Sequence, residues 1–431
     1  MKKAFCLLLL LAPIRFAAAA DAKILTLAEA RHLALTNHPR VNIAEYRVSI
    51  AREGTAEARS AFFPTITANA TAASGVDRDN TRIAAGGLNN PSIYARNAEG
   101  LVVNQVITDF GRTANLVSSA KLRTRGETEN AAASRAQVLL AVDATYFAAL
   151  EAASVVNVAT QTVATRRLVF DQTSALASNK LKSELDVSFA RVTLEEGNLL
   201  LTKSQNELES ALARVATLIG EPMETFRLVD QPLAASSLST NLSDLTQWAL
   251  QHRPELLKLR YDRDAALKFA KAERALHYPV ISAIGAAGVI PIRDENHLPL
   301  DNYVAGGVNL SLPIFAGGLH VARQHEAELR AKVAQETLRE EEDNVLRDVR
   351  IAWLTLSSSG ERMKITAQLL VHATRALSLA ESLYTLGGTS MIELSQAQLN
   401  KTAAEIANIN ARYEFQIQQT SLQFQVGKLG E

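Results

Sequence analysis

The chain has 431 residues and a formal net charge of zero at pH 7, because 45 basic side chains balance 45 acidic ones. This balance creates no overall positive field and therefore gives no argument for binding nucleic acid. The one cysteine, Cys6, lies in an N-terminal segment that we expect to be removed, which would exclude disulfides and cysteine-bound metals from the mature chain.

The first twenty residues have the pattern of an export signal. Lys2 and Lys3 form a short basic head, residues 4–14 are an apolar run, and residues 17–20 are alanines. This order is typical of a signal peptide cleaved just after the alanines, so we expect residues 1–20 to be removed. The run is too short to span a bilayer, which leaves a retained anchor as the weaker alternative. No unbroken run of 18 apolar residues follows, so we expect no transmembrane helix in the mature chain.

The rest of the chain repeats itself once, with an offset of 215 residues in the early part and 207 in the later part. The matched pairs are residues 34–39 with 249–254, Pro64 with Pro279, Ile107 with Ile314, Gly111 with Gly318, and Gly220 with Gly427. Five matches in register indicate an internal duplication. We expect a first repeat at 21–220, a linker at 221–242 and a second repeat at 243–431.

Two long stretches lack the residues that end helices. No proline occurs between Pro91 and Pro222 or after Pro313, and residues 112–178 and 319–385 contain one glycine each. Because proline breaks a helix by removing a donor and clashing with the preceding turn, both stretches can be helical throughout. A helix of 67 residues is roughly 100 Å long, a length typical of coiled coils.

The apolar residues of both stretches follow alternating steps of three and four, the spacing of a coiled-coil seam. In the first stretch they are Leu139, Val142, Tyr146, Ala149, Ala153 and Val156, and in the second Leu346, Val349, Trp353, Leu356, Gly360 and Met363. No polar ligands interrupt the series, which disfavours a cofactor site. We therefore expect this seam to bury side chains between helices.

Between the helices of each repeat the apolar pattern changes to a period of two. We expect four strands, at residues 65–72, 98–107, 280–290 and 303–312. Each has about ten residues with one apolar face, which is the size and pattern of a membrane β-strand. The intervening segments, 74–96 and 291–302, are rich in Gly, Asn, Asp and Pro and are expected to be loops.

Four strands do not close a membrane barrel alone, because the smallest known barrels have about eight. Two subunits would give eight strands and a filled interior, whereas three would give twelve and a wider lumen. A conduit favours three, although composition alone does not choose. The alternative is a pair of soluble hairpins packed on a helical domain, which would have to hide its strand edges.

Three stretches resemble the TolC family of outer-membrane efflux proteins: residues 104–112 (NQVITDFGR), 310–318 (LSLPIFAGG) and 384–397 (YTLGGTSMIELSQA). The first two look like strand-to-helix transitions and the third like a periplasmic tip. The likeness covers essentially the whole mature chain. It implies a mixed α and β fold: a long α-helical coiled-coil tunnel in the periplasm, and four strands contributed to a trimeric, twelve-stranded transmembrane β-barrel. The linker at 221–242 would lie near the tunnel's mid-height.

The resemblance implies an outer-membrane exit duct for efflux or type I secretion. Its expected partners are two further copies of the chain, a periplasmic adaptor (membrane fusion) protein, an inner-membrane pump of RND, ABC or MFS type, and outer-membrane lipid. We expect no cofactor, no metal and no nucleic acid. The rival function is a periplasmic coiled-coil adaptor or scaffold, which would have no use for ten-residue alternating strands. An enzyme is disfavoured because the eight histidines show no metal-ligand spacing and no catalytic triad motif appears.

The resemblance also places a gate at the tip of the second repeat. Glu393 and Gln396 take the positions of two acidic residues that ring the closed aperture, so a trimer would carry three carboxylates. Their mutual repulsion would raise each pKa, whereas a bound cation would lower it. Tyr384 and Asp186 match a tyrosine and an aspartate that tie the tip closed, and Thr389 replaces an arginine of that tie. We therefore expect a gate with fewer links, unless Glu393 and Asp186 are ordinary helix-end carboxylates.

Two short turns match the family's docking sites for the adaptor. They consist of Leu386, Gly387 and Gly388 in the second repeat and Asn179, Lys180 and Leu181 in the first. Glycine permits the positive φ of a tight turn. The first turn departs from the glycine pattern, although asparagine can also adopt the left-handed conformation.

Overall fold

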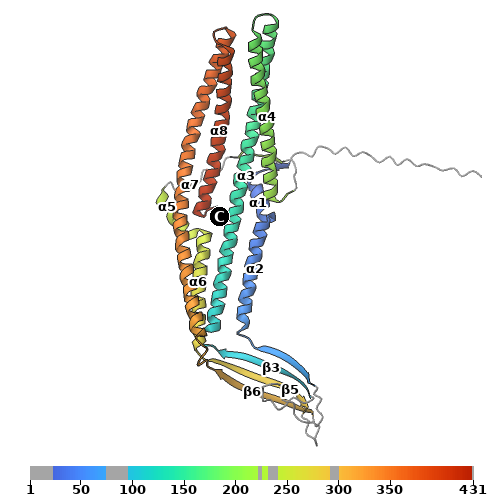
Figure 1. Cartoon of the computed structure of the whole chain (residues 1–431), viewed down its shortest axis with the longest axis vertical. Coiled ribbons are helices and arrows are strands. Elements are labelled where there is room, and N and C mark those ends of the chain that lie inside the picture. The colour runs from blue at the N-terminus through green and yellow to red at the C-terminus, as the bar shows by residue number, and fades with distance from the viewer. Residues whose placement is uncertain (1–22, 74–95, 222–225, 232–240, 292–299, 430–431) are drawn as a thin grey trace, which may run out of the picture. The chain divides into compact units, whose positions relative to one another are not determined.

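The computed structural model (Figure 1) describes residues 23–73, 96–221, 226–231, 241–291 and 300–429. The elements are β1 (Lys23–Leu25), α1 (Leu27–Asn37), α2 (Pro39–Ser60), β2 (Thr65–Ala73), β3 (Arg96–Thr108), α3 (Arg112–Ser178), α4 (Glu184–Ile219), β4 (Phe226–Leu228), α5 (Leu242–His252), α6 (Pro254–Arg274), the 3-10 helix η1 (Ala275–His277), β5 (Val280–Pro291), β6 (Leu300–Ser311), α7 (Leu319–Thr385) and α8 (Met391–Val426). The expected signal peptide and most of the two expected loops lie outside the described residues.

The internal duplication is confirmed by the order and length of these elements. The series α1-α2-β2-β3-α3-α4 recurs as α5-α6-β5-β6-α7-α8. Helices α3 and α7 each have 67 residues, and α4 and α8 each have 36. The predicted long helices at 112–178 and 319–385 are confirmed at both ends, because no proline or paired glycine interrupts either one.

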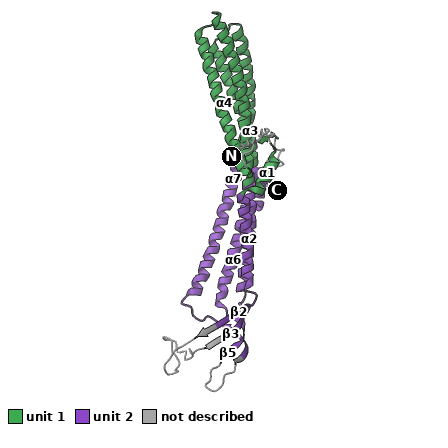
Figure 2. Ribbon diagram, turned by 90° about the vertical axis from the view of Figure 1, so that its right-hand side faces the viewer, with its two compact units in different colours: residues 1–38, 138–237, 355–420 green, residues 39–137, 238–354, 421–431 purple. Residues whose placement is uncertain are grey.

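The chain forms two compact units, each drawn from both repeats (Figure 2). Unit 1 comprises Met1–His38, Val138–Ser237 and Thr355–Thr420, and unit 2 comprises Pro39–Gln137, Leu238–Leu354 and Ser421–Glu431. Helices α3 and α7 begin in unit 2 and end in unit 1. The sequence repeats and the compact units are therefore different divisions of one chain.

Unit 2 contains an antiparallel sheet in the order β2-β3-β5-β6, which confirms the four predicted strands to within a few residues at each end. The strand register gives the sheet two unlike faces. One face carries Ile66, Leu101, Val304, Val308 and Leu310, each half exposed or more. The opposite face carries the polar residues Thr67, Asn104, Ser282 and Asn309 together with the less exposed Val102 and Ile284. Among the described strands, β2 and β6 pair on one side only.

The predicted coiled-coil seam is buried over Leu139 to Ala149 of α3, whereas Ala153 and Val156 are only half-buried. In α3, Leu139 and Val142 are buried as the spacing predicts. In α7, Val349 is fully buried as predicted, but Leu346 is 39% exposed and its neighbour Val345 is buried in its place. A straight helix drifts by about 20° per seven residues relative to a strict heptad, which moves the buried position over such a length.

The segment expected as a linker contains a strand that the sequence pattern did not predict. In unit 1, β4 pairs in parallel with β1. The Tyr146 hydroxyl donates to the Leu25 carbonyl at 2.9 Å and accepts from the Val229 amide at 3.1 Å. Arg412 Nη2 donates to Asp230 Oδ2 at 2.8 Å. These bonds fix the linker segment to helices α3 and α8.

One 18-residue window of α3 passes a composition test for crossing a membrane, with a mean hydropathy of 1.5. Half of this window is buried inside the protein. A core helix that packs against other helices passes the same test, so the window is weak evidence for a membrane span. The sequence criterion, an unbroken apolar run, is not met because Asp143 and Glu151 interrupt the apolar part of the helix.

Candidate functional site

The two predicted docking turns lie at the same end of unit 1 (Figure 1) and share one backbone geometry. In the second turn Gly387 has a φ of 77°, and the Gly388 amide donates to the Leu383 carbonyl at 2.8 Å. In the first turn Lys180 has a φ of 61°, and the Leu181 amide donates back five residues at 2.9 Å. Both are left-handed caps that satisfy carbonyl groups at a helix C-terminus.

The left-handed residue of the first turn is not its asparagine, Asn179. Lys180 takes the left-handed conformation, at the position that corresponds to Gly387. The Asn179 side chain instead donates to the Ala175 carbonyl at 2.8 Å, one helical turn back. The exposed large apolar side chains of the two turns are Leu181, at 70%, and Leu386, at 83%.

The two predicted gate carboxylates, Asp186 and Glu393, occupy equivalent positions as helix caps. Asp186 accepts from the Ser183 hydroxyl at 2.8 Å and from the Ser183 amide at 3.2 Å at the start of α4. Glu393 accepts from the Ser390 amide at 3.1 Å at the start of α8, and from the Thr389 hydroxyl. Both arrangements satisfy amide groups that a helix N-terminus leaves without partners.

The electrostatics of Glu393 follow from these bonds. The hydrogen bond from Thr389, followed by those from Ser390, holds the pKa of this exposed carboxyl below its ordinary value. The rise expected from three carboxylates in a ring concerns an assembly and stays a prediction. The other predicted aperture residue, Gln396, is exposed and donates to Asn400 on the same helix at 2.9 Å.

The structure does not bring Tyr384 and Asp186 together as a tie. The carboxylate of Asp186 is bonded to Ser183, and the buried hydroxyl of Tyr384 has no hydrogen-bond partner among the described residues. Lys182 lies over the Tyr384 ring instead, with Nζ 4.2 Å from the ring centroid. Lys182 could not be identified from the sequence. Its contact with Tyr384 joins the first hairpin to the second and forms only in the folded structure.

An apolar cluster lies beside this contact and joins the two helical hairpins of unit 1. Its buried members are Ala190 of α4 and Met391 and Leu394 of α8. Partly buried side chains from α3 and α7 pack against it, namely Val169, Phe170, Leu377, Ala380 and Tyr384. Every long helix of the two hairpins therefore contributes to one contact next to the turns.

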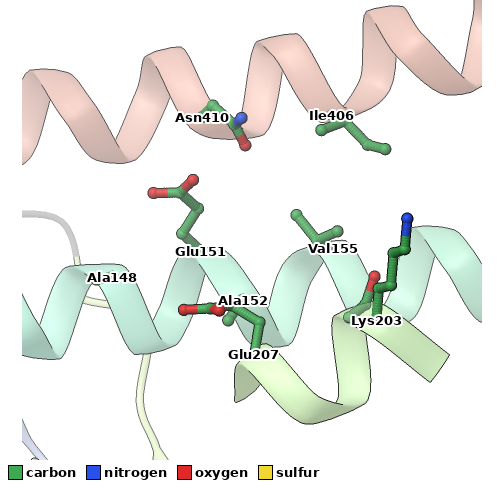
Figure 3. A pocket seen from close by; sticks show the side chains of 9 residues that line it. Ala148, Glu151, Ala152, Val155, Lys203, Glu207, Ile406 and Asn410 are labelled. Atoms are coloured by element: carbon green, nitrogen blue, oxygen red, sulfur yellow. The ribbon is translucent and has the colours of Figure 1, made fainter. Parts of the chain in front are cut away.

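Further along unit 1, α3, α4 and α8 line a cavity of about 390 Å³ (Figure 3). Glu151 and Asn410 face each other across it, and Glu207 and Lys203 enter from α4. Burial, followed by repulsion from Glu414 and Glu207, raises the pKa of Glu151. Glu151 could not be identified from the sequence, because one glutamate in a long helix has no distinguishing signal before its neighbours are known.

Metal binding finds no support in this part of the molecule. Within the described ranges, no group of three or more His, Cys, Asp or Glu side chains is placed to hold an ion. The features that the site offers are exposed turns, helix-capping carboxylates and a contact between two hairpins.

Comparison with known proteins agrees with this description. A family model described as "Outer membrane efflux protein" matches residues 30–221 and 245–428, one match in each repeat. The chain is 23% identical over 410 residues to the outer membrane protein TolC of Vibrio cholerae, covering 94% of this chain and 91% of that protein. It is 25% identical to the alkaline protease secretion protein AprF of Pseudomonas aeruginosa, with coverage of 95% and 86%.

Solved structures share the fold at lower identity. The open state of the Neisseria gonorrhoeae MtrE outer membrane channel superimposes with a TM-score of 0.76 and 19% identity. The match covers 94% of this chain and 89% of that one. At this level of identity the likeness establishes the fold.

Proposed function

The chain belongs to the outer membrane efflux protein family, and on that premise we propose that three copies form a duct with a closable tip. It is an outer-membrane exit duct of efflux or secretion systems, not a periplasmic adaptor or scaffold. In this proposal the copies together close the barrel, an adaptor docks at the turns, and side chains at the tip hold it closed.

The observation that carries the proposal is the sheet with two open edges and two unlike faces. Strands β2 and β6 each lack a second neighbour within the described chain. Unpaired backbone groups are not tolerated in the hydrocarbon region of a bilayer, so a membrane sheet must close on itself. Four strands per chain close as eight, twelve or more strands, and twelve leave a lumen wide enough for cargo.

The faces of the sheet suit this closure. Side chains such as Val304, at 88% exposure, and Val308, at 71%, would meet lipid, whereas Asn104 and Asn309 would line the lumen. Exposed aromatic residues occur just beyond the strand ends. They are Phe62, Phe63, Phe110, Tyr278 and Phe315. Such residues suit the level of the lipid head groups.

The exposed turns with Leu181 and Leu386 are the proposed docking sites for a periplasmic adaptor. The two turns have the same backbone conformation. This supports the role, because one kind of partner could bind both turns. An inner-membrane pump of RND, ABC or MFS type would then choose the cargo. One acidic side chain per chain, Glu393, would give the closed tip a ring of three carboxylates. With Thr389 in place of an arginine, fewer charged links hold the tip.

The test is membrane fractionation followed by native mass determination in detergent. We expect an outer-membrane species with three times the subunit mass. A soluble periplasmic monomer would contradict the proposal. A matched pair of variants tests the faces: Val308→Lys places a charge on the lipid side, and Asn309→Lys places it one residue away on the lumen side. Charge on the lipid face costs about 2–4 kcal/mol near the midplane, so only Val308→Lys should lower the yield of trimer.

A further inference from the structure

Within the described strands β2, β3, β5 and β6, Tyr303 is the one aromatic residue. The strand register places it on the polar face of the sheet, in a row with Gly288 of β5, Gly100 of β3 and Asn69 of β2. Tyr303 lies near the start of β6, whose other end, at Ser311, leads to the helices. The row therefore crosses the sheet near the end that lies away from the helices.

The side chain of Tyr303 lies along the sheet. A Cβ added to Gly288, on the neighbouring strand, would lie 3.0 Å from Tyr303 Cε1. A Cβ added to Gly100, one strand further, would lie 3.0 Å from the Tyr303 hydroxyl oxygen. Neighbouring strands are about 4.8 Å apart, so the side chain extends across β5 to β3. Strand side chains ordinarily stand roughly perpendicular to the sheet. Tyr303 departs from this because two positions in its path have no side chain.

Neither glycine position has room for a side chain while the ring lies there. Non-bonded carbon atoms are optimally about 3.5–4.0 Å apart, so an added Cβ would crowd the ring at both positions. Gly288 has a second reason to be glycine, because its added Cβ would lie 2.4 Å from the Glu99 carbonyl oxygen. A glycine inside a strand often marks the close approach of another group. The ring of Tyr303 is such a group, and it covers the bare backbone of both glycines.

The space that holds the ring, which we call the glycine recess, is bounded by side chains. Val102 and Ala286 are the next residues on the same face of β3 and β5, and they bound the recess on one side. Asn69 ends the row on β2. The recess is therefore one position wide along the strands and crosses two of them. This shape fits one tyrosine ring and no wider side chain.

We propose that the glycine recess holds Tyr303 out of the lumen and thereby sets the width of the barrel at its outer end, the end away from the helices. This inference rests on the proposed function, because it takes the polar face of the sheet to line the lumen. Three symmetric copies would place three tyrosines at one level of the barrel. Lying flat, the rings form part of the wall. Standing perpendicular to the sheet, they would narrow the passage from three sides. Tyr303 is thus a residue that limits the size of the cargo.

The experiment measures access to the lumen from outside intact cells. Asn309→Cys places a thiol on the same face of β6, nearer the helices than Tyr303, in a chain whose other cysteine lies in the expected signal peptide. A small charged maleimide and maleimide–polyethylene glycols of graded length are added outside the cells. The ratio of the large-probe to the small-probe labelling rate reports the width of the lumen between the outer end and the thiol.

Gly100→Ala in this background should lower the ratio at least about twofold, because the ring must leave the recess and enter the lumen. Gly307→Ala, on the same face with nothing within 4 Å of the added Cβ, should leave the ratio unchanged. The Cβ added at Gly100 would also lie 2.9 Å from the Ala287 carbonyl oxygen. Gly100→Ala with Tyr303→Ala keeps that backbone contact and removes the ring. This double variant should therefore restore the ratio.

Two variants of Tyr303 test the recess without changing a glycine. Tyr303→Trp introduces a ring wider than the recess and should lower the ratio, and it decides the question if Gly100→Ala yields no trimer. Tyr303→Ala alone should leave the ratio nearly unchanged, because the flat ring is already part of the wall. An unchanged ratio in trimers of Gly100→Ala or of Tyr303→Trp, or a large rise in Tyr303→Ala, overturns the recess. If the small maleimide does not label Asn309→Cys, the polar face does not line an open lumen, and the proposed function fails instead.

Discussion

The two repeats have the same backbone at corresponding places and different side chains. Lys180 and Gly387 both have positive φ, and each opens a turn that leads to a serine-capped helix. Yet the left-handed residue is a lysine in one turn and a glycine in the other. After duplication, the hydrogen bonds of helix ends restrict the backbone, whereas exposed side chains are free to diverge. Differences between the repeats therefore indicate where each half has acquired its own task.

One difference between the repeats is a buried ion pair that occurs in the first repeat. Arg31 of α1 bonds Asp143 of α3 through two bonds of 2.7 and 2.5 Å, and Asp143 is fully buried. At the corresponding positions the second repeat has Thr246 and Arg350, which form no such pair within the described chain. In the first repeat this pair thus joins the N-terminal helix to the long helix by charge.

Asp143→Ala removes this ion pair and should cause the largest loss of stability. It leaves Arg31 beside a buried site without its partner, and loss of one member of a buried pair costs about 3 kcal/mol or more. The thermal midpoint of the purified protein should fall strongly. Arg350→Ala, the exposed counterpart in the second repeat, should stay within about 0.5 kcal/mol. Equal losses from both variants would show that the pair is not special to the first repeat.

At the C-terminal ends of α4 and α8, in contrast, the two repeats have the same residue and the same backbone conformation. Gly220 and Gly427 follow α4 and α8 with φ values of 70° and 82°. An added Cβ would lie 2.9 Å from Asn37 Cβ in the first case and 3.2 Å from Arg253 Cα in the second. Substitution by alanine should cost about 2 kcal/mol at each site, from backbone strain and crowding together. Chemical denaturation of the two variants should give similar losses, with Gly220→Ala the larger.

Much of the fold was predictable because it depends on local rules. The missing prolines define α3 and α7, and the change of apolar period defines the four strands. The pairing of β1 with β4 was not predictable, because strands of three residues are too short to show a period. The identity of the left-handed residue in the first turn was also missed, since lysine rarely adopts that conformation and the neighbouring Asn179 does so more readily.

The candidate site was predictable only as a location. The turns and the capping carboxylates lie where the sequence placed them, because helix caps are local. The contacts between hairpins are not local. Glu151 has the appearance of any helix glutamate until α4 and α8 line a cavity beside it, and Lys182 meets Tyr384 across two turns that are about 200 residues apart in the chain.

An exchange of the two left-handed residues tests whether the turns are interchangeable. Gly387→Lys puts a Cβ into the left-handed region and should cost about 1 kcal/mol. The reverse change, Lys180→Gly, relieves the same strain but adds freedom to the unfolded chain, so we expect a gain of no more than about 0.5 kcal/mol. Thermal denaturation should show opposite signs for the two variants. A loss in Lys180→Gly would indicate that the lysine side chain makes a contact that repays its strain.

The smallest effect should appear at Glu151, where the second repeat has the exposed Ser358. Glu207 and Glu414 face this carboxyl, and their own charges are balanced by Arg214 at 2.7 Å and Arg362 at 2.8 Å. The pKa of Glu151 is raised above its ordinary value of 4.5, chiefly by burial. The folded state therefore binds the proton more tightly than the unfolded chain does. The stability from this proton is fully present below pH 4.5 and is lost as pH rises through the higher folded-state pKa.

Glu151→Gln removes that titration, so the sign of its effect depends on pH. At pH 7 the wild-type carboxylate is charged and half-buried, and the neutral glutamine should stabilise the protein by less than about 1 kcal/mol. At pH 4 the advantage should vanish, because wild-type Glu151 is then protonated in the folded state. Thermal midpoints of the two proteins across this range provide the measurement, and Ser358→Gln is the control that should leave the pH profile unchanged. A constant difference in thermal midpoint from pH 4 to pH 7 would mean that the charge of Glu151 in the cavity between α3, α4 and α8 does not affect stability. The repeats would then differ here in side-chain shape alone.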